Sequence, residues 1–282
     1  KCGPRFAAQV LAKKRSPQEL RHTKLNAEDL ARLVRRRTQI PARADVDQAL
    51  WRCSVEGITL IDRSSQWWPV SLNDLGPHQP LLLALQGDPK YLSEAPLTAV
   101  VGTRKPSRDG AHSAHVFSKA LVARAHTVVS GGALGIDAIS HRAAVRAGAP
   151  TVAVVATGLD RSYPREHRGL FRAIAQRGVV VSEVLPGAEL TPASFLARNR
   201  IIAALSQATI VVEAPVRSGA LSTASHAATL GRELFAVAPR VANDHNAGFS
   251  RLVDEWAATP LDIGEQTFWE GGTTPTGVRN LG

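Results

Sequence analysis

Short apolar runs recur along most of the chain and alternate with segments whose apolar residues have helical spacing. Six of these runs are rich in β-branched residues, as buried parallel strands are. They cover residues 97–101, 127–129, 151–155, 179–183, 209–213 and 233–237. Between the first two runs, Ala114, Phe117 and Leu121 fall on one helical face of residues 110–124. Strands that alternate with helices in this way predict an α/β fold with a doubly wound, mostly parallel sheet.

The sequence before and after this alternating region has other patterns. Residues 1–50 are basic and predict a small N-terminal helical region. Residues 51–258 form the main predicted domain, which ends with one more helix over 248–256. Residues 259–282 are rich in Gly, Thr and Pro, and we expect this tail to be too short and too polar for another packed domain.

Two further strands are predicted ahead of the main alternation, at residues 57–61 and 81–85. The segment between them is broken by proline and glycine and contains Trp67 and Trp68. Stacking on nucleic-acid bases is one interpretation of these tryptophans. We favour the other, in which they wedge the segment against the main sheet, because large aromatic side chains belong more often to a core.

The charge balance favours a polyanionic partner. The 282-residue chain has 34 basic and 24 acidic residues, a formal net charge of +10, and far more arginine than lysine. Guanidinium groups pair bidentately with phosphate oxygens, so nucleic acid fits this composition. A high-GC genome would explain the arginine-to-lysine ratio but not the net charge. Cys2 and Cys53 have neither metal-site nor disulfide-framework spacing, and neither a membrane span nor a signal peptide is evident. We therefore expect a cytoplasmic protein.

The turns after the first two strands are rich in small residues and should meet at one edge of the sheet. The carboxyl ends of parallel strands lie at that edge, which is where ligands bind in open α/β sheets. The helices that follow present unpaired N–H groups there, which favour phosphate. Arg104 should point outward, and Asp137 should lie in the first turn of a helix and complement its dipole. The candidate nucleic-acid-binding residues in these two turns are Gly102, Thr103, Arg104, Ser107, Ser130, Gly131 and Gly132.

A long loop after residue 183 leads to a third candidate, the segment from Phe195 to Arg200. Phe195 could stack on one base while Arg198, Asn199 and Arg200 hold the flanking phosphates. In the alternative interpretation, Phe195 is a hydrophobic staple at a helix start and the arginines pair with nearby acids. The residues themselves do not decide between the two.

The fourth candidate is the turn over residues 217–223, which is another helix start made of small residues. Ser218 and Gly219 could cap this helix and offer N–H groups to an anion. No hydrolytic or redox pattern accompanies any of the four turns. The histidines lack HExxH spacing, G-x-S-x-G is absent, and the glycines match neither G-x-G-x-x-G nor a P-loop. We therefore expect no catalytic residue, no metal and no cofactor, and a protein that is not an enzyme.

Seven segments in succession read VGTRKPSRDG, VVSGGALGIDAISH, ATGLDRSYPREHRGL, VVSEVLPG, FLARNRIIAALS, VVEAPVRSGALSTA and GRELFAVAP. Together with the segment WWPVSLNDL they resemble the DNA-processing protein A family, also called DprA or Smf, over residues 57–256. The resemblance implies an extended Rossmann-like fold and a single-stranded DNA-binding protein, often a homodimer, that helps load the RecA recombinase during natural transformation. It also implies that DNA contacts Arg104, the turn over residues 130–132, Phe195 and residues 198–200.

The sequence departs from the family pattern in three places. Leu134 stands where arginine is common, Pro239-Arg240 replaces Pro-Gly, and residues 259–282 do not resemble the usual C-terminal winged-helix-like domain. These differences concern partner contacts and the last loop more than the central pocket.

The alternative from another class is an enzyme of the lysine-decarboxylase-like (LOG) family, which cleaves nucleoside monophosphates. That family carries GGxGTxxE, whose glutamate does acid–base work, whereas His226 stands at the corresponding position here. A second alternative is a module that senses a mononucleotide without turnover. The net charge of +10 favours a polyanion over both, since a mononucleotide needs only one local cluster of charge.

Overall fold

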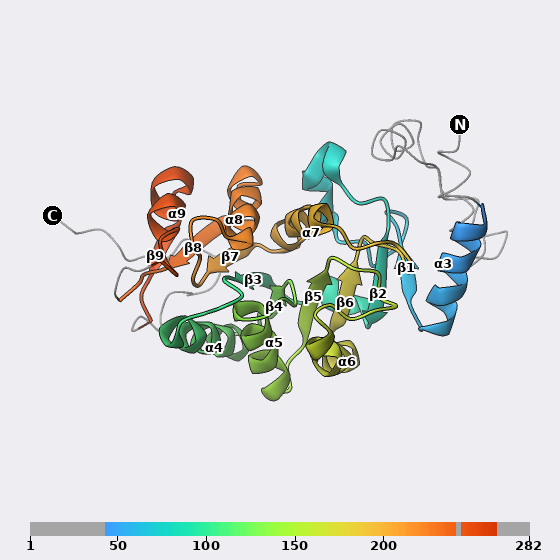
Figure 1. Cartoon of the computed structure of the whole chain (residues 1–282), viewed down its shortest axis with the longest axis horizontal. Coiled ribbons are helices and arrows are strands. Elements are labelled where there is room, and N and C mark those ends of the chain that lie inside the picture. Colours follow the sequence, from blue (N-terminus) through green and yellow to red (C-terminus); the bar gives the residue numbers. More distant parts are fainter. Residues whose placement is uncertain (1–42, 241–243, 264–282) are drawn as a thin grey trace.

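The computed structural model describes residues 43–240 and 244–263. A nine-stranded sheet runs through the middle of this described part, in the order β1-β2-β6-β5-β4-β3-β7-β8-β9 (Figure 1). The strands are β1 (Thr59–Ile61), β2 (Leu83–Gly87), β3 (Leu97–Val101), β4 (Thr127–Ser130), β5 (Thr151–Val155), β6 (Val179–Ser182), β7 (Ala208–Val211), β8 (Glu233–Val237) and β9 (Thr259–Leu261). From β6 to β9 all neighbours pair in parallel, and β2 pairs antiparallel with both β1 and β6.

Helices cover both faces of the sheet. They are α3 (Arg43–Val55), α4 (Arg108–Ala123), α5 (Ile136–Arg146), α6 (Arg168–Arg177), α7 (Pro192–Leu205), α8 (Gly219–Thr229) and α9 (Phe249–Trp256), with short 3-10 segments η2 (Val70–His78), η3 (Pro89–Leu92) and η4 (Arg165–His167). Figure 1 shows α4, α5 and α6 on one face and α7, α8 and α9 on the other. Every residue of β3 and β5 is buried, as expected for strands covered on both sides. The doubly wound, mostly parallel α/β fold predicted from the sequence is confirmed.

The order of the strands sets where a ligand can bind. From β3 the chain moves outward through β4, β5 and β6, and it then returns along α7 to place β7 on the other side of β3. The direction of winding therefore reverses between β3 and β7. In open α/β sheets the crevice next to such a reversal, at the carboxyl ends of the strands, is the usual binding position.

The six predicted parallel strands are all present, with ends that agree within one or two residues. The strand predicted at 81–85 is displaced to Leu83–Gly87, because residues 81 and 82 still belong to the irregular segment that follows η2. Trp68 is buried in the core and Trp67 packs against it, as the wedge interpretation predicts.

The structure adds two details at the predicted domain boundaries. Helix α3 runs through the boundary between residues 50 and 51. Its Leu50 packs against a residue of β1, and its Cys53 belongs to a buried cluster that includes a residue of β2. The predicted tail begins with β9, which pairs with β8 and extends the sheet by one strand. Three residues containing a proline give no periodic signal, so this strand was missed. The division into three parts stays a prediction, and the helices expected before residue 43 lie outside the described residues.

Candidate nucleic-acid interface

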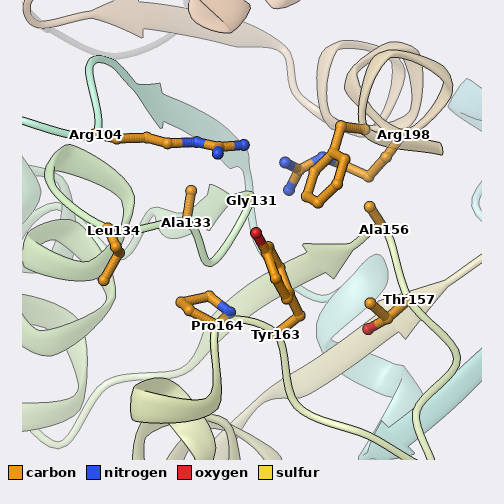
Figure 2. A pocket seen from close by; sticks show the side chains of 10 residues that line it. Arg104, Gly131, Ala133, Leu134, Ala156, Thr157, Tyr163, Pro164 and Arg198 are labelled. Atoms are coloured by element: carbon orange, nitrogen blue, oxygen red, sulfur yellow. The ribbon is translucent and has the colours of Figure 1, made fainter. Parts of the chain in front are cut away.

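A pocket with a cavity volume of about 40 Å³ lies at the carboxyl ends of β3, β4 and β5 (Figure 2). The turns after these strands form one side of it. The residues just before η4 and the first turns of α7 form the other side. Its lining consists of Arg104, Gly131, Ala133, Leu134, Ala156, Thr157, Tyr163, Pro164, Phe195 and Arg198. Four of the predicted site residues, Arg104, Gly131, Phe195 and Arg198, thus meet at the edge of the sheet where the winding pattern placed them.

Two arginines enter this pocket from opposite sides. Figure 2 shows the guanidinium groups of Arg104 and Arg198 directed toward each other above Gly131. Arg104 is exposed, whereas Arg198 is only 8% exposed and donates from Nη1 to the Val154 carbonyl oxygen at 2.6 Å. Burial lowers the pKa of Arg198, the Asp137 carboxylate opposes that shift, and the neighbouring Arg104 adds to it. Two like charges that converge in one pocket favour an anion between them.

Gly131 makes room for the buried guanidinium. A Cβ at this position would overlap Nη1 of Arg198 and lie 2.5 Å from its Cζ. The glycine is therefore required by the close approach of the Arg198 side chain. This is a different reason from the one predicted, which was a bare backbone for a phosphate.

The second turn is not a free anion site, because Asp137 already occupies it. Its Oδ2 accepts hydrogen bonds from the backbone N–H groups of Gly131 at 3.1 Å and Ala133 at 3.2 Å. Asp137 lies in the first turn of α5, as predicted, and burial raises the pKa of its carboxyl group. The expectation that the Gly131 N–H is available to a ligand is wrong. The positive character of the pocket comes from the arginine side chains instead.

Two aromatic rings form one wall of the pocket. Phe195 is half-buried in the first turns of α7, and its ring lies edge-on to that of Tyr163, with centroids 5.5 Å apart and planes at 63°. The Arg104 guanidinium lies 5.3 Å from the centre of the Phe195 ring. Tyr163 is 44% exposed. Tyr163 is a pocket residue that was not among the predicted site residues, although an aromatic side chain within the basic segment RSYPREHR was a usable signal.

Arg200 and Asn199 do not reach the pocket. Arg200 is 4% exposed, and its Nη2 donates to both carboxylate oxygens of Glu183 at 2.7 Å. Asn199 is buried and donates from Nδ2 to the carbonyl oxygen of Gly219 at 3.1 Å, which ties α7 to the start of α8. For Arg200 the structure therefore shows the interpretation in which the arginine pairs with an acid. Both side chains hold α7 in place rather than face the solvent.

Two of the three predicted serines, Ser107 and Ser218, cap helices. The Ser107 hydroxyl accepts from the Gly110 N–H at 3.0 Å and caps α4, and the Ser218 hydroxyl accepts from the Ala220 N–H at 3.2 Å and caps α8. Beside Ser218, a Cβ on Gly219 would meet nothing within 4 Å. Neither serine lines the pocket.

The remaining predicted residues shape the turns beneath the pocket. The Thr103 N–H donates to the Glu213 carbonyl oxygen at 2.7 Å, and a Cβ on Gly102 would lie 2.6 Å from the Ile136 side chain. The Ser130 hydroxyl donates to the Val100 carbonyl oxygen at 2.6 Å. Gly132 has a φ of +68°, a conformation that favours glycine. These residues support the site but are not part of its lining.

Among the described residues, no three His, Cys, Asp or Glu side chains gather as a metal site would require. His226, the residue that matters for the hydrolase alternative, is half-buried on α8. Burial lowers its pKa, and the nearby charges of Arg200 and His78 act in the same direction. In residues 43–240 and 244–263, no helix is long and apolar enough to cross a membrane.

The family model for DNA recombination-mediator protein A matches residues 59–268 of the chain. The chain belongs to this family. It is 39% identical over 236 residues to a DNA processing protein DprA of Mycobacterium tuberculosis. The matched region covers 80% of this chain and 60% of that protein. It therefore spans about three fifths of that relative's length. The DNA processing protein DprA of Bacillus subtilis is 35% identical, with 72% of this chain and 68% of the relative covered.

Two solved structures of DNA processing protein A share this fold. The structure from Streptococcus pneumoniae has a TM-score of 0.72 and 30% identity, and covers 93% of this chain and 90% of its own. The structure from Helicobacter pylori, described for its single-stranded DNA binding mode, has a TM-score of 0.66 and 28% identity, with coverages of 74% and 93%. The extended Rossmann-like architecture implied by the sequence motifs is thus confirmed in this DprA family member.

Proposed function

We propose that this DprA family member binds single-stranded DNA in the pocket at the carboxyl ends of β3, β4 and β5. The observation that carries the proposal is the convergence of Arg104 and Arg198 in a pocket with two aromatic side chains. A phosphate between the two guanidinium groups would relieve their mutual repulsion. The net charge of +10 supplies the longer-range attraction that a polyanion needs.

The aromatic wall favours single strands over duplexes. Tyr163 and Phe195 can contact a base only if that base is not already stacked and paired within a duplex. Stacking of this kind accepts any base, because every base has a π-face. The protein should therefore bind oligonucleotides of different sequence with similar affinity. The single-stranded DNA binding described for the Helicobacter pylori protein supports the same choice.

The test is a salt series with single- and double-stranded oligonucleotides of equal length. Each phosphate contact contributes roughly 0.7 to the slope of log affinity against log salt for a single strand. Arg104→Ala should therefore weaken binding and reduce this slope, whereas Arg146→Ala, at an exposed position on α5, serves as the charge-matched control. Equal affinity for duplex and single strand, or an unchanged slope in Arg104→Ala, would contradict the proposal.

The partner part of the proposal rests on the family resemblance. The protein would act as a homodimer in the cytoplasm and deliver single-stranded DNA to a RecA-type recombinase. Sedimentation of the purified chain tests the dimer. A recombinase-loading assay on DNA covered by a single-strand-binding protein tests the partnership, and a chain that binds DNA but leaves loading unchanged would remove the recombinase from the proposal.

We further propose that the protein turns over no substrate and needs no cofactor. His226 is the best acid–base candidate for the hydrolase alternative, but it stands where that family has a glutamate and it does not line the pocket. Incubation with nucleoside monophosphates should release no free base, and incubation with DNA and magnesium should produce no nicks. Turnover that disappears in His226→Ala would instead place the protein among the hydrolases.

A further inference from the structure

Two loops lead to the aromatic side chains of the pocket, and a carboxylate that belongs to one loop accepts a hydrogen bond from the other. The tyrosine loop, residues 156–164, follows β5 and carries Tyr163. The entry loop, residues 183–191, follows β6 and leads into α7, where Phe195 lies. Asp160 stands in the middle of the tyrosine loop, and its side chain is 10% exposed. It does not line the pocket.

Asp160 joins three separate parts of the chain. Its Oδ2 accepts a hydrogen bond from the Gly187 N–H of the entry loop at 3.0 Å. The same oxygen accepts from Nη1 of Arg52, on helix α3, at 2.8 Å. A Cβ on Gly187 would lie 3.6 Å from the Arg52 guanidinium, so the helix packs directly against the entry loop. The ion pair therefore connects α3, at the end of the molecule beside β1, to both loops of the pocket (Figure 1).

The two loops also contact each other beside this ion pair. Nη2 of Arg161 donates to the Ala188 carbonyl oxygen at 2.7 Å, and just before the entry loop, at the end of β6, the Ser182 hydroxyl donates to the Thr157 carbonyl oxygen at 2.7 Å. A Cβ on Gly158 would lie 2.7 Å from the Leu185 carbonyl oxygen. The loops thus pack as one unit, and Asp160 is the point at which that unit is fixed to α3.

We propose that Asp160 and Arg52 are positioning residues for the nucleic-acid site, and that α3 sets the arrangement of Tyr163 and Phe195 through them. This inference rests on the proposed function, since it concerns the same pocket. The edge-on pair of rings requires both loops to keep their mutual position. If the entry loop is released from Asp160, the two rings can separate in the DNA-free protein. The free energy needed to order them again then lowers the affinity for DNA.

The sign of the effect separates positioning from plain electrostatics. Asp160→Asn removes a negative charge near a DNA site, so charge alone predicts tighter binding. Positioning predicts the opposite, a loss of about fivefold to tenfold in affinity for a single-stranded oligonucleotide, with the salt slope unchanged because no phosphate contact is lost. Glu189→Gln, at an exposed position of the entry loop, removes the same charge and should bind as well as the wild type or slightly better.

A double-mutant cycle completes the test. Arg52→Gln should weaken binding by a similar factor, Arg52→Lys should retain most of the wild-type affinity, and Arg52→Gln should have no further effect in Asp160→Asn. Hydrogen exchange of the Gly187 amide should accelerate in Asp160→Asn while that of β5 does not. If Asp160→Asn does not fold, Arg52→Gln, at a partly exposed position, carries the test through two other readouts: positioning predicts an unchanged salt slope and faster exchange of the Gly187 amide, and a reduced slope or unchanged exchange would overturn it.

The outcomes for this inference and for the proposed function are distinct. Wild-type protein that does not bind single-stranded DNA, or that binds it without Arg104, overturns the proposed function and this inference with it. Wild-type protein that binds through Arg104 while Asp160→Asn and Arg52→Gln bind equally well or more tightly overturns the positioning role alone. Additive effects of the two substitutions overturn it as well.

Discussion

The substitution Gly131→Ala tests whether the buried Arg198 guanidinium belongs to the binding site. The new methyl group would overlap Nη1 of Arg198 and lie 2.5 and 2.7 Å from Cζ and Nη2, so the guanidinium has to leave its position. It then loses its hydrogen bond to the Val154 carbonyl oxygen and its place opposite Arg104. Gly131 itself does not have a φ in the left-handed region, so the effect comes from the side chain it displaces.

The size of the effect follows from the contact that is lost. A hydrogen bond to a charged group contributes about 1.5–3 kcal/mol. If Arg198 binds a phosphate, its displacement should lower affinity by about tenfold to a hundredfold, since about 1.4 kcal/mol corresponds to a factor of ten. The slope of log affinity against log salt should also fall by roughly 0.7, because one phosphate contact is lost from a single strand.

Fluorescence polarisation of a labelled oligonucleotide across a salt series measures both quantities. Gly169→Ala is the matched control: it adds the same methyl group on α6, where nothing lies within 4 Å, and it should bind like the wild type. Urea unfolding checks that Gly131→Ala is folded. A folded Gly131→Ala protein with wild-type affinity and wild-type salt slope would show that Arg198 takes no part in binding.

Three further predictions concern the neighbouring residues. Phe195→Ala should cost about 1–3 kcal/mol of binding free energy for every oligonucleotide sequence at an unchanged salt slope, whereas Phe195→Leu restores affinity only if the ring is a staple rather than a stacking surface. Arg200→Ala should lower the free energy of unfolding by about 2–4 kcal/mol, because it leaves Glu183 without this partner, and should not change the salt slope. Burial lowers the pKa of His141 to about 3 from 6.5. Below about pH 6.5 the imidazole is therefore protonated in the unfolded chain but not in the folded protein, and the free energy of unfolding falls by about 1.4 kcal/mol per pH unit. Urea unfolding at pH 7 and 5.5 measures this loss; Asp137, whose pKa is raised by burial, acts in the opposite direction, so comparison with His141→Gln isolates the histidine.

The fold could be read from the sequence because its main signals are local. Buried parallel strands are continuous apolar runs, and the ends of β5 and β8 coincide with those of the runs that predict them. The edge of the sheet that carries the site also follows from local order, since each turn comes directly after its strand. Of the two elements that were displaced or missed, β9 has only three residues and contains a proline, and β2 follows a segment interrupted by proline.

The roles within the site depend on contacts that sequence order does not contain. Arg198 and Arg200 are two residues apart on one helix, yet one faces the pocket and the other pairs with Glu183. That outcome depends on where β6 ends relative to α7, which no local pattern encodes. Asp137 was correctly placed in a helix turn, but its bonds to Gly131 and Ala133 depend on the path of the turn ahead of α5.

The position of α7 has a consequence for how the protein is made. This helix returns the chain from β6 to β7, and it packs on β3, β4 and β5 as well as on α8 and η2. It therefore has its complete set of contacts only after α8, which follows β7 in the chain, has packed against it. Contacts between segments this far apart in sequence form slowly, because the intervening chain must first be closed into a loop. A chain still on the ribosome, with β7 and α8 not yet emerged, already contains both Arg104 and Arg198 but has no finished pocket to hold them. Affinity for DNA should thus arise late in synthesis, when the part that brings the two arginines together is complete.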